Sequence, residues 1–142
     1  MEPYDDFGVP QPAHHGVPRV LIVDDELDHA EICAALLRRR GYNVAVAITG
    51  NDAIELAHAL KPDLILLDLF MPMVDGFSTA ATLHEHPDTT NVPIVFLSAC
   101  ADAASWTRVG ELGAASFLSK PFRAHELISC VEQSLSRHRP PR

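Results

Sequence analysis

The chain has 142 residues, the usual size of one domain, and its 47% hydrophobic and 21% charged residues are those of an ordinary globular protein. Asp and Glu number 19 against 11 Lys and Arg, and the resulting net charge of −8 disfavours direct nucleic-acid binding. No apolar run approaches the ~20 residues that cross a bilayer, and the N-terminus does not resemble a secretory signal. The three cysteines are far apart and form no C-x-x-C pair, so we expect reduced thiols in a cytoplasmic protein.

Both ends of the chain lack the pattern of a folded segment. Residues 1–18 contain four prolines and two glycines without an apolar period. A segment of this kind cannot bury enough surface to offset the entropy that ordering would cost. We therefore predict a flexible N-terminal arm at residues 1–18, one folded domain at residues 19–136 and a C-terminal tail at residues 137–142.

The first half of this domain alternates between strands and helices. In chain order we predict a strand at 19–23, a helix that ends at Arg40-Gly41, a strand at 43–47, a helix opened by Thr49 and ended by Pro62, and a strand at 63–68. The apolar faces expected for the two helices are Ile32, Cys33, Leu36 and Leu37, and then Ala53, Leu56, Ala57 and Leu60.

The second half continues the alternation. We predict a helix at 77–85, a strand at 92–97 that ends at Ser98, a helix through Trp106 to Leu112, a strand at 115–118, and a last helix with Leu127, Val131 and Leu135 on one face. The strand at 63–68 contains four consecutive apolar residues, which indicates a strand covered on both faces, as in a parallel sheet. Five strands alternating with five helices therefore predict an α/β fold.

Polar residues stand where the predicted strands end. They are Asp24 and Asp25 after the first strand, Asp68 at the end of the third, Ser98 at the end of the fourth, and Lys120 after the fifth. Open α/β sheets bind ligands beyond the carboxyl ends of their strands, so these side chains are the first candidates for a site. Each has an ordinary alternative, because an Asp after a strand often caps a helix and a lone Ser often forms a turn. Because all five residues are expected at the same edge of one sheet, we favour a functional site over a set of unrelated caps and turns.

The three carboxylates indicate the chemistry of this edge. Neighbouring carboxylates repel one another, and one would be protonated unless a cation neutralised the group. Oxygen ligands suit Mg²⁺, and Lys120 would be drawn to the same cluster. A carboxylate beside a metal, with an ammonium and a hydroxyl nearby, is equipped to accept a phosphoryl group as an acyl phosphate. The cluster therefore predicts Mg²⁺-dependent phosphoryl transfer onto an aspartate.

Five motifs along residues 19–136 resemble the receiver domain of two-component response regulators, including the stand-alone receivers of chemotaxis. They are Val20–Glu26, Pro62–Asp68, Met71-Pro72 with Asp75-Gly76, Pro93–Ala99, and Gly113-Ala114 with Phe117–Phe122. Any one motif is weak, but all five occur in order and with the expected gaps. The resemblance implies a flavodoxin-like, doubly wound sheet of five parallel strands in the order 2-1-3-4-5, with five helices.

The resemblance also implies roles for the residues at the strand ends. Asp68 takes the position of the phosphoacceptor. Asp24 and Asp25 take those of Mg²⁺ ligands, with Asp68 itself and the backbone carbonyl of Phe70 as further ligands. Lys120, aimed inward by a cis peptide bond to the following proline, would contact the phosphoryl oxygens.

Two further positions correspond to the switch of this family. Ser98 supplies the hydroxyl that would move to bond the phosphoryl group, and Phe117 the aromatic ring that would turn inward with it. Phe117 has no phenolic hydroxyl, so packing alone must set its position. The output surface would comprise the fourth helix, the fifth strand and the fifth helix, including Trp106.

The resulting prediction is a single-domain response regulator. A histidine kinase or a histidine phosphotransfer protein would donate the phosphoryl group to Asp68, and the changed surface would bind a protein target or relay the phosphoryl group, without direct nucleic-acid or membrane contact. Such a receiver catalyses only its own phosphorylation and dephosphorylation. Two alternatives stay open: a binding module that is never phosphorylated, and a phosphatase with an Asp nucleophile, which would resemble Asp-x-Asp where this chain has Asp68-Leu69-Phe70.

Overall fold

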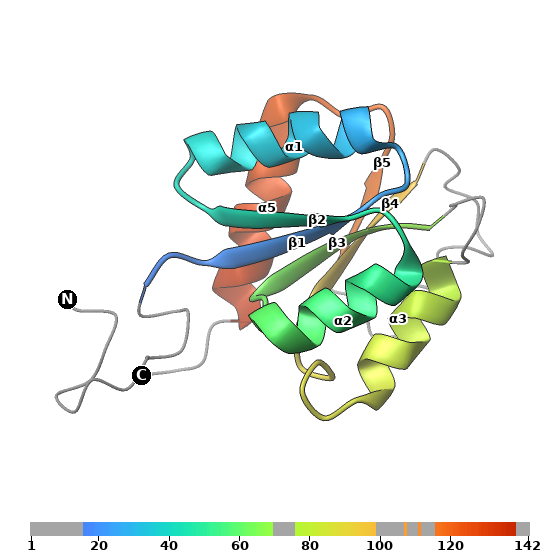
Figure 1. The fold of residues 1–142 in the computed structure, drawn as a ribbon. Helices are drawn as coiled ribbons and strands as arrows, with labels where there is room; N and C mark the ends of the chain where they lie inside the picture. Colours follow the sequence, from blue (N-terminus) through green and yellow to red (C-terminus); the bar gives the residue numbers. More distant parts are fainter. Residues whose placement is uncertain (1–15, 70–75, 99–106, 108–110, 112–115, 139–142) are drawn as a thin grey trace, which may run out of the picture.

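Strands and helices alternate along the chain in the computed structural model (Figure 1), which describes residues 16–69, 76–98, 107, 111 and 116–138. The strands are β1 (Arg19–Val23), β2 (Asn43–Ala47), β3 (Leu64–Asp68), β4 (Ile94–Ser98) and β5 (Ser116–Ser119). The helices with defined bounds are α1 (Leu27–Arg39), α2 (Gly50–Leu60), α3 (Gly76–Glu85) and α5 (Ala124–His138).

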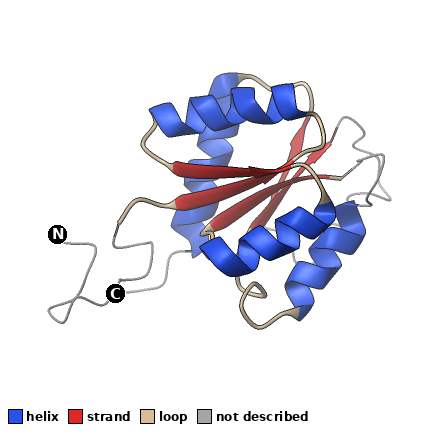
Figure 2. Ribbon diagram, viewed as in Figure 1, coloured by secondary structure: helices blue, strands red, loops and turns tan. Residues whose placement is uncertain are grey.

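The five strands form one parallel sheet in the order β2-β1-β3-β4-β5. This order confirms the flavodoxin-like arrangement expected from the resemblance. The strand order reverses beside β1, because the chain moves from β1 outward to β2 and then returns to place β3 on the other side. All strands point the same way, as Figure 2 shows, so their carboxyl ends meet at one edge of the sheet.

Helices α1 and α5 cover one face of the sheet, and α2 and α3 cover the other (Figure 1). Alternate residues of the central strand β3 point to opposite faces. Leu64 and Leu66 pack with α1 and α5, whereas Ile65 and Leu67 pack with α2 and α3. This double burial explains the unbroken apolar run of β3, every residue of which is buried.

Small side chains contribute to the helix packing on both faces of the sheet. On the α1/α5 face the fully or nearly fully buried helix residues are Ala30, Cys33, Ala34, Leu37, Leu127 and Val131. On the α2/α3 face they are Ala53, Ala57, Phe77, Ala80 and Leu83. Small residues dominate where α1 and α2 meet the sheet, which lets the helix backbones approach it closely.

The sequence explains where α2 begins and ends. The Thr49 hydroxyl accepts a hydrogen bond from the backbone N–H of Asp52 at 3.0 Å, as predicted for the N-cap of this helix. At the other end Lys61 adopts a left-handed conformation with φ of 49°. Its N–H still donates to the carbonyl of Ala57, and Pro62 follows, so the helix stops at the predicted place.

Two predicted core positions are wrong. The side chain of Ile32 is 61% exposed, because the buried residues of α1 recur at positions 30, 33, 34 and 37 and leave Ile32 on another side of the helix. Leu60 is 37% exposed at the last residue of α2. By contrast, Leu127 and Val131 are buried as expected, and Leu135 packs partly buried beside them.

Two further predictions concern the fourth helix and the C-terminal tail. Of the helix predicted through Trp106 to Leu112, only Thr107 and Glu111 are described, and both are helical. Helix α5 extends to His138, two residues into the stretch predicted as a C-terminal tail. Within the described part of the chain, no helix has the length and apolar character needed to cross a membrane.

Candidate functional site

Three carboxylates gather at the carboxyl edge of the sheet. Asp24 and Asp25 directly follow β1, and Asp68 is the last residue of the neighbouring strand β3. One carboxylate oxygen from each of the three lies within 4.8 Å of the others. Asp24 is fully buried, Asp68 is 5% exposed, and Asp25 is half-buried. The strand order thus brings together residues that are 44 positions apart in sequence.

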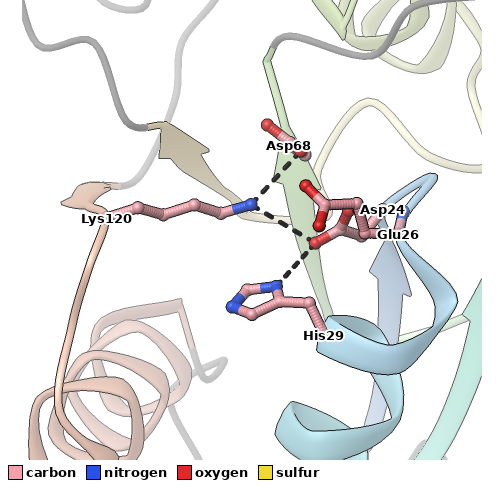
Figure 3. Close-up of polar contacts among 5 residues, drawn as sticks. All are labelled: Asp24, Glu26, His29, Asp68 and Lys120. Atoms are coloured by element: carbon pink, nitrogen blue, oxygen red, sulfur yellow. Dashed lines mark hydrogen bonds and ion pairs between the residues drawn. The ribbon is translucent and has the colours of Figure 1, made fainter.

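Lys120 joins two of these carboxylates. It follows β5, and its Nζ lies 3.2 Å from Oδ2 of Asp68 and 3.3 Å from Oδ2 of Asp24 (Figure 3). The Lys120 side chain is only 17% exposed, so its ammonium is held at the edge rather than in open solvent. The peptide bond between Lys120 and Pro121 is cis, as the resemblance implied.

The carboxylate of Asp24 is held by donors from three parts of the chain. Its Oδ1 accepts the backbone N–H of Glu26 at 3.0 Å, and its Oδ2 accepts from Lys120 and lies 2.8 Å from Nδ1 of His29. Burial by itself raises the pKa of Asp24. The hydrogen bonds from Glu26 and His29, together with the charge of Lys120, outweigh that effect and lower the pKa below its ordinary value. Asp24 is therefore ionised at neutral pH.

Lys120 shows the complementary effect. Burial lowers the pKa of its ammonium, but the negative charges and hydrogen bonds of Asp68 and Asp24 outweigh burial and raise the pKa above the ordinary value. Lys120 is therefore positively charged at neutral pH, and its ammonium links the carboxylates that follow β1 and end β3.

Ser98 and Phe117 lie on the neighbouring strands β4 and β5, as the sequence predicts. Ser98 is the fully buried last residue of β4, and its carbonyl accepts the backbone N–H of Lys120 at 2.8 Å. Phe117 in β5 is 9% exposed and pairs in register with Phe96 of β4, within the core on the α2/α3 face. One backbone hydrogen bond thus ties the lysine to the strand that carries the hydroxyl.

Of the residues between β3 and α3, the structure describes Leu69. Phe70, expected to contribute a backbone carbonyl, lies outside the described residues, as does Trp106. The segment returns to the site at Gly76, whose N–H donates to the carbonyl of Leu69 at 3.0 Å. A Cβ at Gly76 would stand 2.5 Å from the carbonyl oxygen of Asp68, so only glycine fits this close approach.

His29 is a site residue that the sequence analysis missed. It lies in the first turn of α1, and its ring faces Asp24 from the side of the helix (Figure 3). The available signal was its distance of five residues from Asp24, which places it one turn into the helix that follows. That distance alone does not tell which way the side chain points.

The three carboxylates fit a magnesium ion. Mg²⁺ prefers hard oxygen ligands and is usually held by one or two carboxylates plus waters and phosphate oxygens. The oxygens of Asp24, Asp25 and Asp68 lie close enough together to share one cation. Their mutual repulsion would also be relieved by it. The donor set is therefore that of a divalent-metal site beside an ammonium group.

Comparison with known proteins agrees with this arrangement. Residues 20–132 match the model of the response regulator receiver domain. The chain is 35% identical over 121 residues to the DNA-binding dual master transcriptional regulator RpaA of Synechocystis sp.; that match covers 85% of this chain but 50% of the relative, so the chain spans half the length of that relative.

Solved structures give the same result. A putative response regulator from Chloroflexus aurantiacus superposes with a TM-score of 0.80 at 34% identity, covering 86% of this chain and all of that one. The receiver domain of a signal transduction histidine kinase from Syntrophus aciditrophicus superposes with a TM-score of 0.79 at 30% identity, covering 89% of this chain and 96% of that one. The chain belongs to the family of response regulator receiver domains.

Proposed function

We propose that this receiver domain is a phosphorylation-controlled switch with Asp68 as its phosphoacceptor. The observation that carries the proposal is the ion pair of Lys120 with both Asp68 and Asp24 beside a third carboxylate, Asp25, at the carboxyl edge of the sheet. A lysine in this place can pair with the free carboxylate of Asp68 before phosphorylation and with the phosphoryl oxygens after it.

In the proposed reaction a carboxylate oxygen of Asp68 attacks the phosphorus of a phosphohistidine on a kinase or phosphotransfer protein. The P–O bond forms as the P–N bond breaks, and the leaving imidazole keeps the electron pair and takes up a proton. Hydrolysis reverses the modification: water attacks the phosphorus, the bond to Asp68 breaks, and inorganic phosphate leaves. Lys120 stabilises the negative charge on the phosphoryl oxygens in both steps.

Asp24, Asp25 and Asp68 would hold Mg²⁺, with the backbone carbonyl of Phe70 as a further ligand. The bound ion would neutralise charge on the phosphoryl oxygens and align them with the attacking carboxylate. Asp24 contributes as an ionised group, since its buried carboxylate has a lowered pKa.

The switch would run from Ser98 to Phe117. The Ser98 hydroxyl would bond the phosphoryl group and Phe117 would change its packing, which would alter the surface of the fourth helix, β5 and α5. The hydrogen bond from the backbone N–H of Lys120 to the carbonyl of Ser98 supports a link between phosphorylation and β4. It ties the lysine that would contact the phosphoryl group to the strand that carries the Ser98 hydroxyl. The partner would be a protein target or the next member of a phosphorelay.

The wider context of the domain is part of the proposal. RpaA is by its name a DNA-binding regulator, and this chain matches half of it. The net charge of −8 supports an output of this domain through protein contacts rather than through direct binding of nucleic acid. Catalysis would be confined to the domain's own phosphorylation and dephosphorylation.

Intact-protein mass spectrometry tests the proposal. The native chain is incubated with acetyl phosphate and Mg²⁺, beside Asp68→Asn and a sample with excess chelator. We expect one added phosphoryl group on the native chain with Mg²⁺ and none on the other two. A native chain that gains no mass from acetyl phosphate or from a panel of phosphorylated kinases would contradict phosphorylation and support the binding module that is never phosphorylated. Continuous release of phosphate from phosphomonoesters would instead support the phosphatase.

A further inference from the structure

His29 is a polar group at the site for which the proposed reaction has no role. Its Nδ1 lies 2.8 Å from Oδ2 of Asp24, and its side chain is 32% exposed. The ring also contacts Phe122, with centroids 5.7 Å apart and an angle of 62° between the planes. The imidazole thus contacts both a buried carboxylate and an aromatic ring.

The direction of the hydrogen bond follows from the charge of Asp24. An ionised carboxylate can only accept, and Asp24 is ionised at neutral pH. The proton must therefore sit on Nδ1 of His29, which donates to Oδ2. This bond needs no positive charge on the imidazole, because the neutral ring with its proton on Nδ1 makes the same contact.

His29 and Lys120 share one oxygen. Figure 3 shows the contacts from both residues ending on Oδ2 of Asp24, at 2.8 Å and 3.3 Å. Lys120 also contacts Asp68 at 3.2 Å. A phosphoryl group on Asp68 would attract the ammonium, and Oδ2 of the fully buried Asp24 would then lose a donor. A buried carboxylate oxygen without any donor is costly, so in the absence of His29 this loss would oppose phosphorylation.

We propose that His29 is a positioning residue for Asp24: it keeps Oδ2 partnered from the side of α1, so that Lys120 is free to turn to the phosphoryl group while the carboxylate keeps its orientation. This inference rests on the proposed function. Hydrogen-bonded partners of metal-binding side chains commonly change affinity or activity by ten- to a hundredfold when removed, about the range expected here.

The test compares two variants of His29 with the native chain. His29→Leu removes the donor and keeps an apolar side chain against Phe122. His29→Asn keeps an N–H near the place of Nδ1. We expect the rate of phosphorylation by acetyl phosphate and the affinity for Mg²⁺, measured by calorimetry, to fall about tenfold in the Leu variant. Both quantities should return to within about threefold of native in the Asn variant.

The matched control is His125→Leu, which changes an exposed histidine in the first turn of α5. We expect native rate and affinity for it. A second control places His29→Leu in an Asp24→Asn background, where its effect should vanish because the carboxylate through which His29 acts is gone. A general loss of folding would persist in that background and would lower the melting temperature as well.

The outcomes separate this inference from the proposed function. A native chain phosphorylated on Asp68 whose Leu variant matches it in rate and Mg²⁺ affinity overturns the role of His29 only. An effect that Asn fails to rescue, or that persists without Asp24, overturns it too. A native chain that takes up neither a phosphoryl group nor Mg²⁺ overturns the proposed function and, with it, the role of His29.

Discussion

Gly76 shows how one residue shapes the site at the smallest scale. It is buried at the start of α3, where a Cβ would stand 2.5 Å from the carbonyl oxygen of Asp68 and 2.7 Å from the Cα of Leu69. Both atoms belong to the backbone, which cannot turn aside as a flexible side chain can. The glycine therefore lets the chain after β3 return close beside the proposed phosphoacceptor.

Replacing this glycine by alanine should destabilise the protein despite the better helix propensity of alanine. We expect Gly76→Ala to lower the free energy of unfolding in urea by about 1–3 kcal/mol, because the backbone of Asp68 and Leu69 must shift. Ser78→Ala changes an exposed residue of the same helix and should stay within about 0.5 kcal/mol of native. A gain of about 1 kcal/mol in Gly76→Ala, as propensity alone would give, would refute the close approach.

At the scale of elements, the sequence predicts the positions of the strands well, but it predicts less well which face of each helix is buried. The run in β3 could be interpreted because its first four residues, Leu64 to Leu67, are all apolar. In α1 the prediction selected large side chains, whereas the structure buries a stripe with period 3–4 that contains two alanines, Ala30 and Ala34. Size misled the prediction at Ile32, since an alanine stripe offers little contrast with its neighbours.

Two substitutions in α1 test this assignment of faces. Leu37 is fully buried in the core on the α1/α5 face, and Ile32 is 61% exposed. We expect Leu37→Ala to cost about 2–5 kcal/mol of unfolding free energy, through lost burial and the cavity left behind. Ile32→Ala should cost less than about 0.5 kcal/mol. Equal losses in the two variants, measured by urea denaturation, would show that the exposed and buried faces are assigned wrongly.

At the scale of the whole molecule, the parallel sheet explains why so much of the site could be predicted. Residues at strand ends must meet at one edge, so Asp24, Asp25, Asp68 and Lys120 could be grouped from their positions alone. His29 could not, because its contact depends on the rotation of α1 about its axis relative to the sheet. That rotation is set by packing along the entire helix, which no short motif contains.

The buried charges also predict how the whole molecule responds to acid. The pKa of Asp24 is lower in the folded protein than its ordinary value of 3.8. The stability that it contributes is therefore fully present above that value and is lost as pH falls through the lower, folded value. Urea denaturation from about pH 6 to about pH 3 should show a smaller decline in unfolding free energy for Asp24→Asn than for the native chain. Parallel declines in the two proteins would refute this contribution.

The most direct test of the central claim is to locate the phosphoryl group on the chain. The native protein is treated with acetyl phosphate and Mg²⁺ and then with borohydride, which reduces an acyl phosphate to an alcohol and so converts the modified aspartate to homoserine. Peptide sequencing by mass spectrometry should find homoserine at position 68 and nowhere else, and only in the sample that received acetyl phosphate. Homoserine at another carboxylate, or an unreduced Asp68 in a protein that has gained a phosphoryl group, would contradict the account.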